Sequence, residues 1–370
     1  MKLSISRNTL QTSLQHLAKA TPTRSTIPIL SQVLFEAKEN KLELRATDLE
    51  ITVVIKTEAS IITEGSIAIP HKTLIDITNA LPETEIVIEV INNSRIIIQT
   101  TFGNYDISGS APEEFPSMPE VDNKKEINIS SKTLKRLIDK TSFALSADEL
   151  KPALMGALLE VKPQNIASIA TDGHRLSFCA RSDFSSVGYE GDVIIPKKFL
   201  GLVLPYLEQE KKSTLWVGDN HVTVSFDQIT IFSRIVDEQY PNYKAVLPVD
   251  NNKKILVDRE ELLSSVKRVS IFSNRSTRQV EITLTNNQAV VTTEDAEKAT
   301  SAKEIIKVEY NSENISLGFN ANYLVDILSH LDTKKVKITM NTPTSAVLIT
   351  PVSQAEDEEN TMLLMPMRTN

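Results

Sequence analysis

The sequence predicts an α+β protein made of three tandem, similar domains, because internal repeats, helical apolar spacing and short strands all recur along it. ELRATDLEIT and ASIATDGHRLS share a core motif, and AVVTTEDAEKAT is a weaker third version. Three further segments also align: AIPHKTLIDITNALP, IIPKKFLGLVLPYL and GFNANYLVDILSHLD. So do RNTLQTSLQHLAKA, SSKTLKRLIDKTSF and DREELLSSVKRVSI. Three copies of about 120 residues therefore account for nearly the whole chain.

Two polar stretches separate the copies. EEFPSMPEVDNKKEINI (113–129) and DEQYPNYKAVLPVDNNKKILV (237–257) each combine acidic residues, an aromatic residue and prolines with a stretch that resembles Val-Asp-Asn-Lys-Lys. Neither has apolar periodicity, which is typical of linkers. We expect domains at 1–121, 127–249 and 254–370.

Each copy is expected to run β-α-β-β-β twice. The spacing of Leu10, Leu14 and Leu17 predicts a helix over 7–20. Similar patterns predict the other helices, at 71–81, 132–141, 197–207, 258–269 and 320–331. Helix starts are expected at three N-caps and after two prolines: Asn8, Ser131, Asp258, Pro70 and Pro196.

Strands are predicted most clearly by RIIIQT, HVTVSF and AVLIT, several of which follow polar two-residue turns. A sheet whose outer strands stay unpaired is a surface for association. Copies in a row must leave two such edges or close on each other, and a head-to-tail contact that closes gives a ring.

Composition excludes several classes of protein. Apolar residues make up 41% and charged residues 24%, as in ordinary soluble proteins. No apolar run approaches the ~18 residues of a membrane span, and MKLSISRNTL lacks the features of a signal peptide, so we expect a cytoplasmic protein without membrane partners. The single cysteine, Cys179, excludes an internal disulfide and a cysteine-based zinc site. Neither GxGxxG nor GxxxxGK[ST] occurs, and we expect no cofactor and no metal.

The net charge of −8 argues against a conventional nucleic-acid binder. The predicted helices, however, are a basic minority: 132–141 holds four cations against Asp139, and 197–207 adds Lys197 and Lys198. One interpretation is that these are solvated helix faces. The other is that the polar faces of all six helices surround a hole and attract phosphates without reading bases.

Three segments together carry a family resemblance. ATDGHRLS, EQYPNYKAVLP and the C-terminal MPMR resemble the bacterial DNA sliding clamps, the beta subunits of DNA polymerase III, and the resemblance covers the full length. It implies a head-to-tail homodimeric ring of six similar domains, with helices lining the hole and sheets forming the rim. It also implies a processivity factor that is not an enzyme. The implied partners are double-stranded DNA, the replicative DNA polymerase, a clamp-loader ATPase, and other replication and repair proteins that carry a short clamp-binding peptide.

The apolar tail TMLLMPMR is unusual for a chain end. It could simply be a core strand. The resemblance instead implies that it walls an apolar pocket for partner peptides, between the second and third domains. The implied pocket residues are Leu154, Thr171, Gly173, His174, Arg175, Leu176, Pro241, Val246, Leu363, Leu364, Met365, Pro366, Met367 and Arg368. The chain departs from the family pattern in two places, at the Thr369-Asn370 ending and at Leu363 and Leu364, which replace smaller residues and would tighten the pocket floor.

DNA and dimer contacts are expected elsewhere. Arg24 and Lys151 match family loops near DNA, and helix position adds Lys72, Lys132, Lys135, Lys197 and Lys198. The alternative for each is ordinary solvent exposure. For the dimer, the resemblance implies an apolar contact of Tyr105 and Ile107 with Ile271 and Phe272. The alternative is that these four belong to cores within their domains.

The TDGHRL segment also admits an enzyme reading, with Asp172 and His174 in acid–base roles. Asp48 occupies the same position in the first copy without a histidine, so we expect Asp172 to be a turn residue that caps its own backbone. No nucleophile, metal cluster or oxyanion motif supports catalysis. A scaffold whose repeats bind only proteins remains the other alternative.

Overall fold

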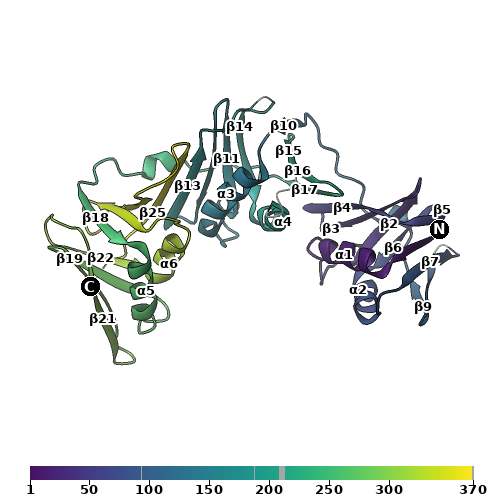
Figure 1. Cartoon of the computed structure of the whole chain (residues 1–370), viewed down its shortest axis with the longest axis horizontal. Helices are drawn as coiled ribbons and strands as arrows, with labels where there is room; N and C mark the ends of the chain where they lie inside the picture. The colour runs from purple at the N-terminus through teal and green to yellow at the C-terminus, as the bar shows by residue number, and fades with distance from the viewer. Residues whose placement is uncertain (93, 187, 208–212, 369–370) are drawn as a thin grey trace. The chain divides into compact units, whose positions relative to one another are not determined.

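The computed structural model of the chain describes residues 1–92, 94–186, 188–207 and 213–368. The Thr369-Asn370 ending lies outside the described residues. In these ranges every copy runs β-α-β-β-β twice, as predicted, and the mixture of helices and strands confirms the α+β class (Figure 1). One short strand, β5, was not predicted.

The elements follow the three copies in order. The first copy contains β1 (Lys2–Ser6), α1 (Arg7–Leu17), β2 (Gln32–Lys38), β3 (Lys41–Thr47), β4 (Ile51–Glu58), β5 (Ser60–Thr63), β6 (Gly65–Pro70), α2 (His71–Ala80), β7 (Glu85–Ile91), β8 (Arg95–Thr100) and β9 (Gly103–Ser108). The second contains β10 (Lys125–Ile127), α3 (Ser131–Thr141), β11 (Gly156–Lys162), β12 (Asn165–Thr171), β13 (Arg175–Arg181), β14 (Gly191–Pro196), α4 (Lys197–Leu207), β15 (Ser213–Val217), β16 (His221–Phe226) and β17 (Ile229–Arg234). The third contains β18 (Lys253–Asp258), α5 (Arg259–Ser270), β19 (Gln279–Thr285), β20 (Gln288–Asp295), β21 (Thr300–Lys307), β22 (Ile315–Asn320), α6 (Ala321–Ser329), β23 (Lys335–Met340), β24 (Val347–Pro351) and β25 (Glu358–Leu364).

The helix starts test the predicted caps. Asp258 is confirmed, because its carboxylate accepts hydrogen bonds from the amides of Glu260 and Glu261. Asn8 is wrong: α1 begins earlier, and Ser6 caps it by accepting from the Thr9 amide at 3.2 Å. Serine is as good a cap as asparagine, so the sequence could not separate two candidates so close together. The helices α2 and α4 begin directly after Pro70 and Pro196, as expected.

One compact unit comprises Met1–Ser131 and Gly201–Ile235. It contains a five-stranded sheet, β5-β1-β7-β8-β9, and an eight-stranded sheet, β10-β15-β16-β17-β4-β3-β2-β6. α1 and α2 pack against each other and against these strands (Figure 1). Leu10, Leu14 and Leu17 of α1 are all fully buried, so the predicted apolar face of this helix is confirmed.

The other compact unit comprises Lys132–Leu200 and Val236–Asn370. Its eight-stranded sheet runs β14-β11-β12-β13-β25-β24-β23-β18, and its four-stranded sheet runs β21-β20-β19-β22. α5 and α6 pack together over a large apolar core that includes Leu262, Val266 and Leu324 (Figure 1). Each buried leucine or valine of this kind stabilises the fold by about 1.5–3 kcal/mol.

Both eight-stranded sheets cross from one copy to the next. β4 of the first copy pairs with β17 of the second, from Ile55↔Ile229 to Ile51↔Ser233. β13 of the second copy pairs with β25 of the third along its whole length. Antiparallel main-chain hydrogen bonds, and not linkers alone, therefore join successive copies, and the compact units divide the chain within the second copy.

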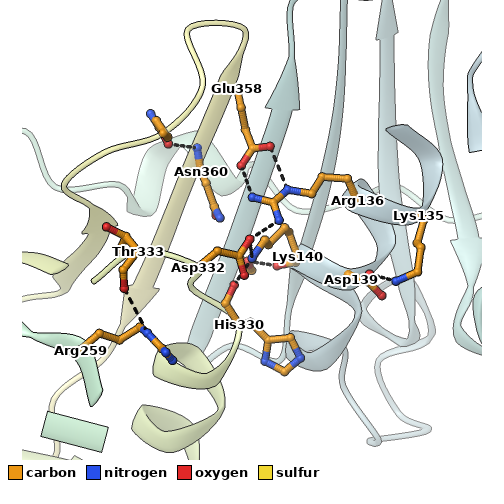
Figure 2. A network of polar contacts seen from close by, with 12 residues as sticks. Lys135, Arg136, Asp139, Lys140, Arg259, His330, Asp332, Thr333, Glu358 and Asn360 are labelled. Atoms are coloured by element: carbon orange, nitrogen blue, oxygen red, sulfur yellow. Dashed lines mark hydrogen bonds and ion pairs between the residues drawn. The ribbon is translucent and has the colours of Figure 1, made fainter. Parts of the chain in front are cut away.

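A polar network also joins the second and third copies (Figure 2). Arg136 of α3 donates two hydrogen bonds to Glu358 of β25, at 2.7 and 2.9 Å, and a third to Asp332. Lys140, one turn further along α3, contacts Asp332 at 2.8 Å and donates to the main-chain oxygen of His330. Arg181 of β13 also donates to Glu358, at 3.2 Å.

The charges of this junction are segregated by copy. The cations come from the second copy: Arg136, Lys140, Arg175 and Arg181. The anions that they contact across the junction come from the third: Asp326, Asp332, Asp357 and Glu358. Burial by itself would raise the pKa of Glu358, but hydrogen bonds and charge from Arg136 and Arg181 outweigh burial and lower it.

We predict that Glu358→Gln destabilises the unit at pH 7 by about 3 kcal/mol, because it leaves two arginines facing a neutral, 4% exposed side chain. The pKa of Glu358 is lowered on folding, so its contribution is fully present above the usual carboxyl pKa of 4.5 and is lost as the pH falls through the lower folded value. Urea midpoints from pH 7 to pH 3 should show wild type and variant converging in acid. The matched control is Glu359→Gln, the exposed neighbour on the same strand. A gap between wild type and Glu358→Gln that stays constant down to pH 3 would contradict this account.

Candidate functional site

The segment Thr171–Arg175 forms a tight turn between β12 and β13. The Asp172 carboxylate accepts hydrogen bonds from the amides of His174 and Arg175, at 2.9 and 3.0 Å. The Thr171 hydroxyl donates to the Arg175 carbonyl and accepts from the Gly173 amide. Gly173 has φ +90°, a conformation that glycine adopts without strain. The prediction that Asp172 is a turn residue is confirmed.

The first copy contains the same turn. Asp48 accepts from the amides of Glu50 and Ile51, at 3.1 and 2.7 Å, and Leu49 occupies the glycine position with φ +77°. The motif therefore belongs to the repeated fold. In the second copy the other oxygen of Asp172 accepts from Arg175 Nε at 3.1 Å, so the carboxylate is committed to structure rather than to acid–base chemistry.

The C-terminal strand β25 lies directly beside this turn. It ends at Leu364, which pairs with Arg175, while Leu363 pairs with Leu176. Beyond it, the Met365 amide donates to the His174 carbonyl at 2.9 Å, and the Met367 amide donates to the Gly318 carbonyl at 2.8 Å. As predicted, the tail leaves the regular ladder at the proline, because proline has no N–H to donate.

Neighbouring residues of β25 point to opposite faces of the sheet. Leu363 joins a small apolar cluster with Leu158, Leu176 and Tyr243. Leu364 is fully buried in the large core of the third copy. The prediction that Leu364 lines the pocket is therefore corrected: side chains alternate along a strand, so only one of two adjacent leucines can face the small cluster.

The other residues predicted to line the pocket differ in how exposed their side chains are. Leu154 and Leu176 are buried, and Leu176 belongs to the small cluster. Val246 is 54% exposed and Met365 39% exposed. The other surface positions are exposed or half-buried: Thr171, Gly173, His174, Pro241, Pro366, Met367 and Arg368. Arg175 is buried and held by ion pairs. Exposed and half-buried side chains of the turn, the tail and the 241–246 segment therefore lie in the same unit as a buried apolar cluster.

Sequence reasoning missed several residues of this surface. The ring of Tyr323, on α6, stacks on His174 with 6.1 Å between ring centroids. Tyr240, Leu247, Ala346 and Leu348 pack against the small cluster. The sequence places Tyr323 only in a predicted helix, and tertiary packing brings it to the turn. Burial, followed by the charge of Asp172, raises the pKa of Tyr323 and keeps its phenol neutral.

The basic candidates lie in different environments. Arg24, Lys132, Lys197 and Lys198 are exposed. Lys72 and Lys151 are exposed but lie 3.1 Å from Asp76 and 3.8 Å from Asp148. Lys135 is half-buried and paired with Asp139. Arg136 and Lys140, which add to the positive charge of α3, are bound to carboxylates of the third copy.

The dimer candidates lie near sheet edges. Tyr105 and Ile107 are half-buried on β9, the last strand of the five-stranded sheet. Ile271 is 75% exposed, and Phe272 beside it is also exposed, just beyond the end of α5. The alternative that Ile271 and Phe272 belong to a domain core is wrong. In the four-stranded sheet, β21 is an edge strand that presents Ile305 to solvent.

Over the described ranges, no group of three or more His, Cys, Asp or Glu side chains could hold a metal ion. Over the same ranges, no helix has the length and apolar character needed to cross a membrane.

Family models match nearly the whole chain in three consecutive pieces. Residues 1–119 match the N-terminal domain of the DNA polymerase III beta subunit, residues 128–242 its central domain and residues 244–368 its C-terminal domain. The chain belongs to the DNA polymerase III beta subunit family. This family comprises the bacterial sliding clamps, which are non-enzymatic processivity factors for DNA polymerase III in DNA replication, and the fold described above is the sliding-clamp fold.

Individual clamps agree over their full length. The beta sliding clamp of Pseudomonas aeruginosa is 31% identical over 370 residues, covering 100% of both chains, and that of Synechococcus elongatus is 30% identical, covering 100% of this chain and 99% of the relative. A crystal structure of the Pseudomonas aeruginosa DNA polymerase III subunit beta superimposes with a TM-score of 0.93 at 30% identity. A Bartonella birtlesii sliding clamp, solved bound to griselimycin, superimposes with a TM-score of 0.92 at 29% identity. Both structures are covered completely, as is this chain.

We predict that Asp172→Ala speeds amide hydrogen exchange at His174 and Arg175 by about fivefold to tenfold, because each amide loses its acceptor. Asp48→Ala is the matched control and should have the same effect only at Glu50 and Ile51 of the other unit. Exchange measured by NMR or mass spectrometry tests both. Unchanged exchange at 174–175 in Asp172→Ala would show that the carboxylate does not hold the turn.

Proposed function

We propose that two copies of this clamp close head to tail into a ring that encircles duplex DNA without reading its sequence. The ring tethers the replicative polymerase through an apolar peptide pocket. In this proposal the domains are 1–121, 127–249 and 254–370, the helices line the hole and the sheets form the rim. The protein acts in the cytoplasm and is opened by a clamp-loader ATPase. Other replication and repair proteins dock on the same pocket.

Two free sheet edges support closure of the ring. β9 ends one sheet in the first copy, β21 ends another in the third, and each carries half-buried or exposed apolar side chains. Each edge presents unpaired main-chain groups to a new strand. In the proposed dimer contact, Tyr105 and Ile107 of one chain would cover the exposed Ile271 and Phe272 of the other. Two chains that form this contact at both ends make a closed ring with no unpaired end.

Charge distribution supports contact with DNA through phosphates. The chain is acidic overall, yet exposed lysines and one arginine occur at helix starts and in the loop after α1: Lys72, Lys132, Lys197, Lys198 and Arg24. A few phosphate contacts give weak, salt-sensitive and sequence-independent binding, which permits sliding. The acidic remainder of the surface repels DNA. Lys72, Lys135 and Lys151, each paired with an aspartate, are weaker candidates.

The pocket proposal rests on the surface formed by the turn, the tail and the 241–246 segment. Burying two apolar side chains of a partner on this surface contributes about 3–6 kcal/mol before association costs. After those costs one peptide binds in roughly the micromolar range. Two pockets per dimer let a two-armed partner bind more tightly through effective concentration, and partners can still exchange.

The single observation that supports this function is the family match over the full length of the chain. Encirclement is tested by comparing circular DNA with linear DNA. The protein is loaded onto nicked circular DNA by the cognate clamp loader, separated by gel filtration and then treated with an enzyme that linearises the circle. We predict retention on circles and loss from linear ends. Equal retention on circular and linear DNA would reject encirclement and favour ordinary surface binding.

The pocket is tested with griselimycin, the ligand in the Bartonella and Pseudomonas clamp structures. The double variant Val246→Ala, Met365→Ala removes two accessible apolar walls and should weaken griselimycin binding by about tenfold in isothermal titration. Val352→Ala, at an exposed valine between β24 and β25, is the control and should bind normally. Size-exclusion chromatography should show an intact dimer in each case. Normal affinity in the double variant would place the ligand elsewhere.

A further inference from the structure

We propose that Arg175 is a positioning residue that fixes the Thr171–Arg175 turn of the second copy to α6 of the third through Asp326, and so sets the shape of the peptide pocket. This inference rests on the proposed pocket. It reassigns Arg175, which the family resemblance places among the residues that line the pocket, to a role inside the wall.

The hydrogen bonds of the Arg175 guanidinium point in three directions. Nε donates to Asp172 in the turn at 3.1 Å, and Nη1 donates to Asp326 on α6 at 2.6 Å. Nη2 donates to the main-chain oxygen of Phe143 at 2.8 Å. The side chain is only 9% exposed, so little of it remains accessible to a peptide. Its contacts join the turn, α6 and the segment after α3.

Aromatic rings extend this contact to the surface. The Tyr323 ring lies 4.5 Å from Arg175 Cζ, and the Phe143 ring lies 5.5 Å from it, both within cation–π range. The same Tyr323 ring stacks on the exposed His174. Arg175 and Tyr323 thus pack in sequence behind His174, the exposed residue of the turn.

The Thr171–Arg175 turn also contacts the C-terminal tail through a main-chain hydrogen bond. The His174 carbonyl accepts the Met365 amide at 2.9 Å, and Met365 is one of the accessible walls. A shift of the turn relative to α6 would therefore move Met365 as well. Through this chain of contacts, a buried arginine affects a surface that it does not itself form.

The first copy shows that the turn does not need an arginine. At the equivalent position Ile51 is buried, and Asp48 still accepts from the Glu50 and Ile51 amides. The Arg234 amide donates to the Glu50 carbonyl at 2.9 Å, matching the bond from Met365 to His174. What Arg175 adds is attachment to a helix of the next copy, which is the feature a defined pocket requires.

Lysine cannot reproduce this arrangement. The planar guanidinium directs N–H donors along fixed, divergent directions, whereas an ammonium is a point charge on a flexible stem. Arg175→Lys keeps the charge but cannot reach all three acceptors at once. We expect it to weaken griselimycin binding by about tenfold.

The decisive variant is Asp326→Asn. Asp326 lies on α6 and its side chain is 45% exposed, so folding should be retained. If Arg175 acts through Asp326, Asp326→Asn weakens griselimycin binding about as much as Arg175→Lys, and the double variant is no weaker than either single one. Amide exchange of Met365 should speed up in both. Asp332→Asn is the matched control, since Asp332 pairs with Arg136 and Lys140 in the same junction and should leave affinity unchanged.

Three outcomes overturn the proposal. Wild-type affinity in Asp326→Asn with loss in Arg175→Lys means that Arg175 touches the ligand directly. Equal losses in Asp326→Asn and Asp332→Asn mean that the whole junction has merely loosened. Wild-type affinity in both Arg175→Lys and Asp326→Asn removes any positioning role. Failure of the underlying pocket proposal looks different, because then the wild-type protein itself does not bind griselimycin or the Val246 and Met365 double variant binds it normally.

Discussion

Antiparallel pairing between strands of successive copies is the interaction on which the rest of this structure depends. β4 pairs with β17, and β13 pairs with β25, so a sheet begun in one copy is completed by the next. Main-chain hydrogen bonds are directional and obligatory, and a one-residue slip would turn every side chain to the wrong face. The register of β13 against β25 places Leu363 in the small cluster and Leu364 in the large core. The proposed pocket lies where this ladder stops, at the turn of Asp172 and at the proline that follows Met365.

Electrostatics reinforces the second of these junctions. Its second-copy side is cationic and its third-copy side anionic, with Glu358 held between two arginines. Ion pairs of this kind contribute little when exposed, but an unpaired charge at a buried position is costly. These ion pairs therefore contribute more to the specificity of pairing between the second and third copies than to the total stability of the fold. The junction also pairs Arg136 and Lys140 with carboxylates of the third copy, so these two residues contribute less to the positive charge of α3 than the sequence indicates.

Several features were accessible from local pattern. The three copies, the apolar faces of α1 and α5, the helix starts after Pro70 and Pro196 and the turn role of Asp172 all follow from interactions between residues close in sequence. The errors were of two kinds. Asn8 is predicted as the cap of α1, whereas Ser6, an equally good capping residue two positions earlier, caps it in the structure. Leu364 is predicted to line the pocket because a family motif does not show which face of the sheet each residue of a strand occupies.

The amino-acid sequence by itself determined the repeat, the secondary structure of each copy and the family, since these depend on periodicities and motifs that short-range sterics and hydrogen bonding impose. Only the tertiary structure decided which cations form ion pairs between copies, that Tyr323 stacks on His174, and that Arg175 is buried and ion-paired. Those outcomes depend on contacts between residues more than 100 positions apart, such as Arg175 with Asp326. Side chains so distant in sequence become neighbours only after the strands of successive copies have paired.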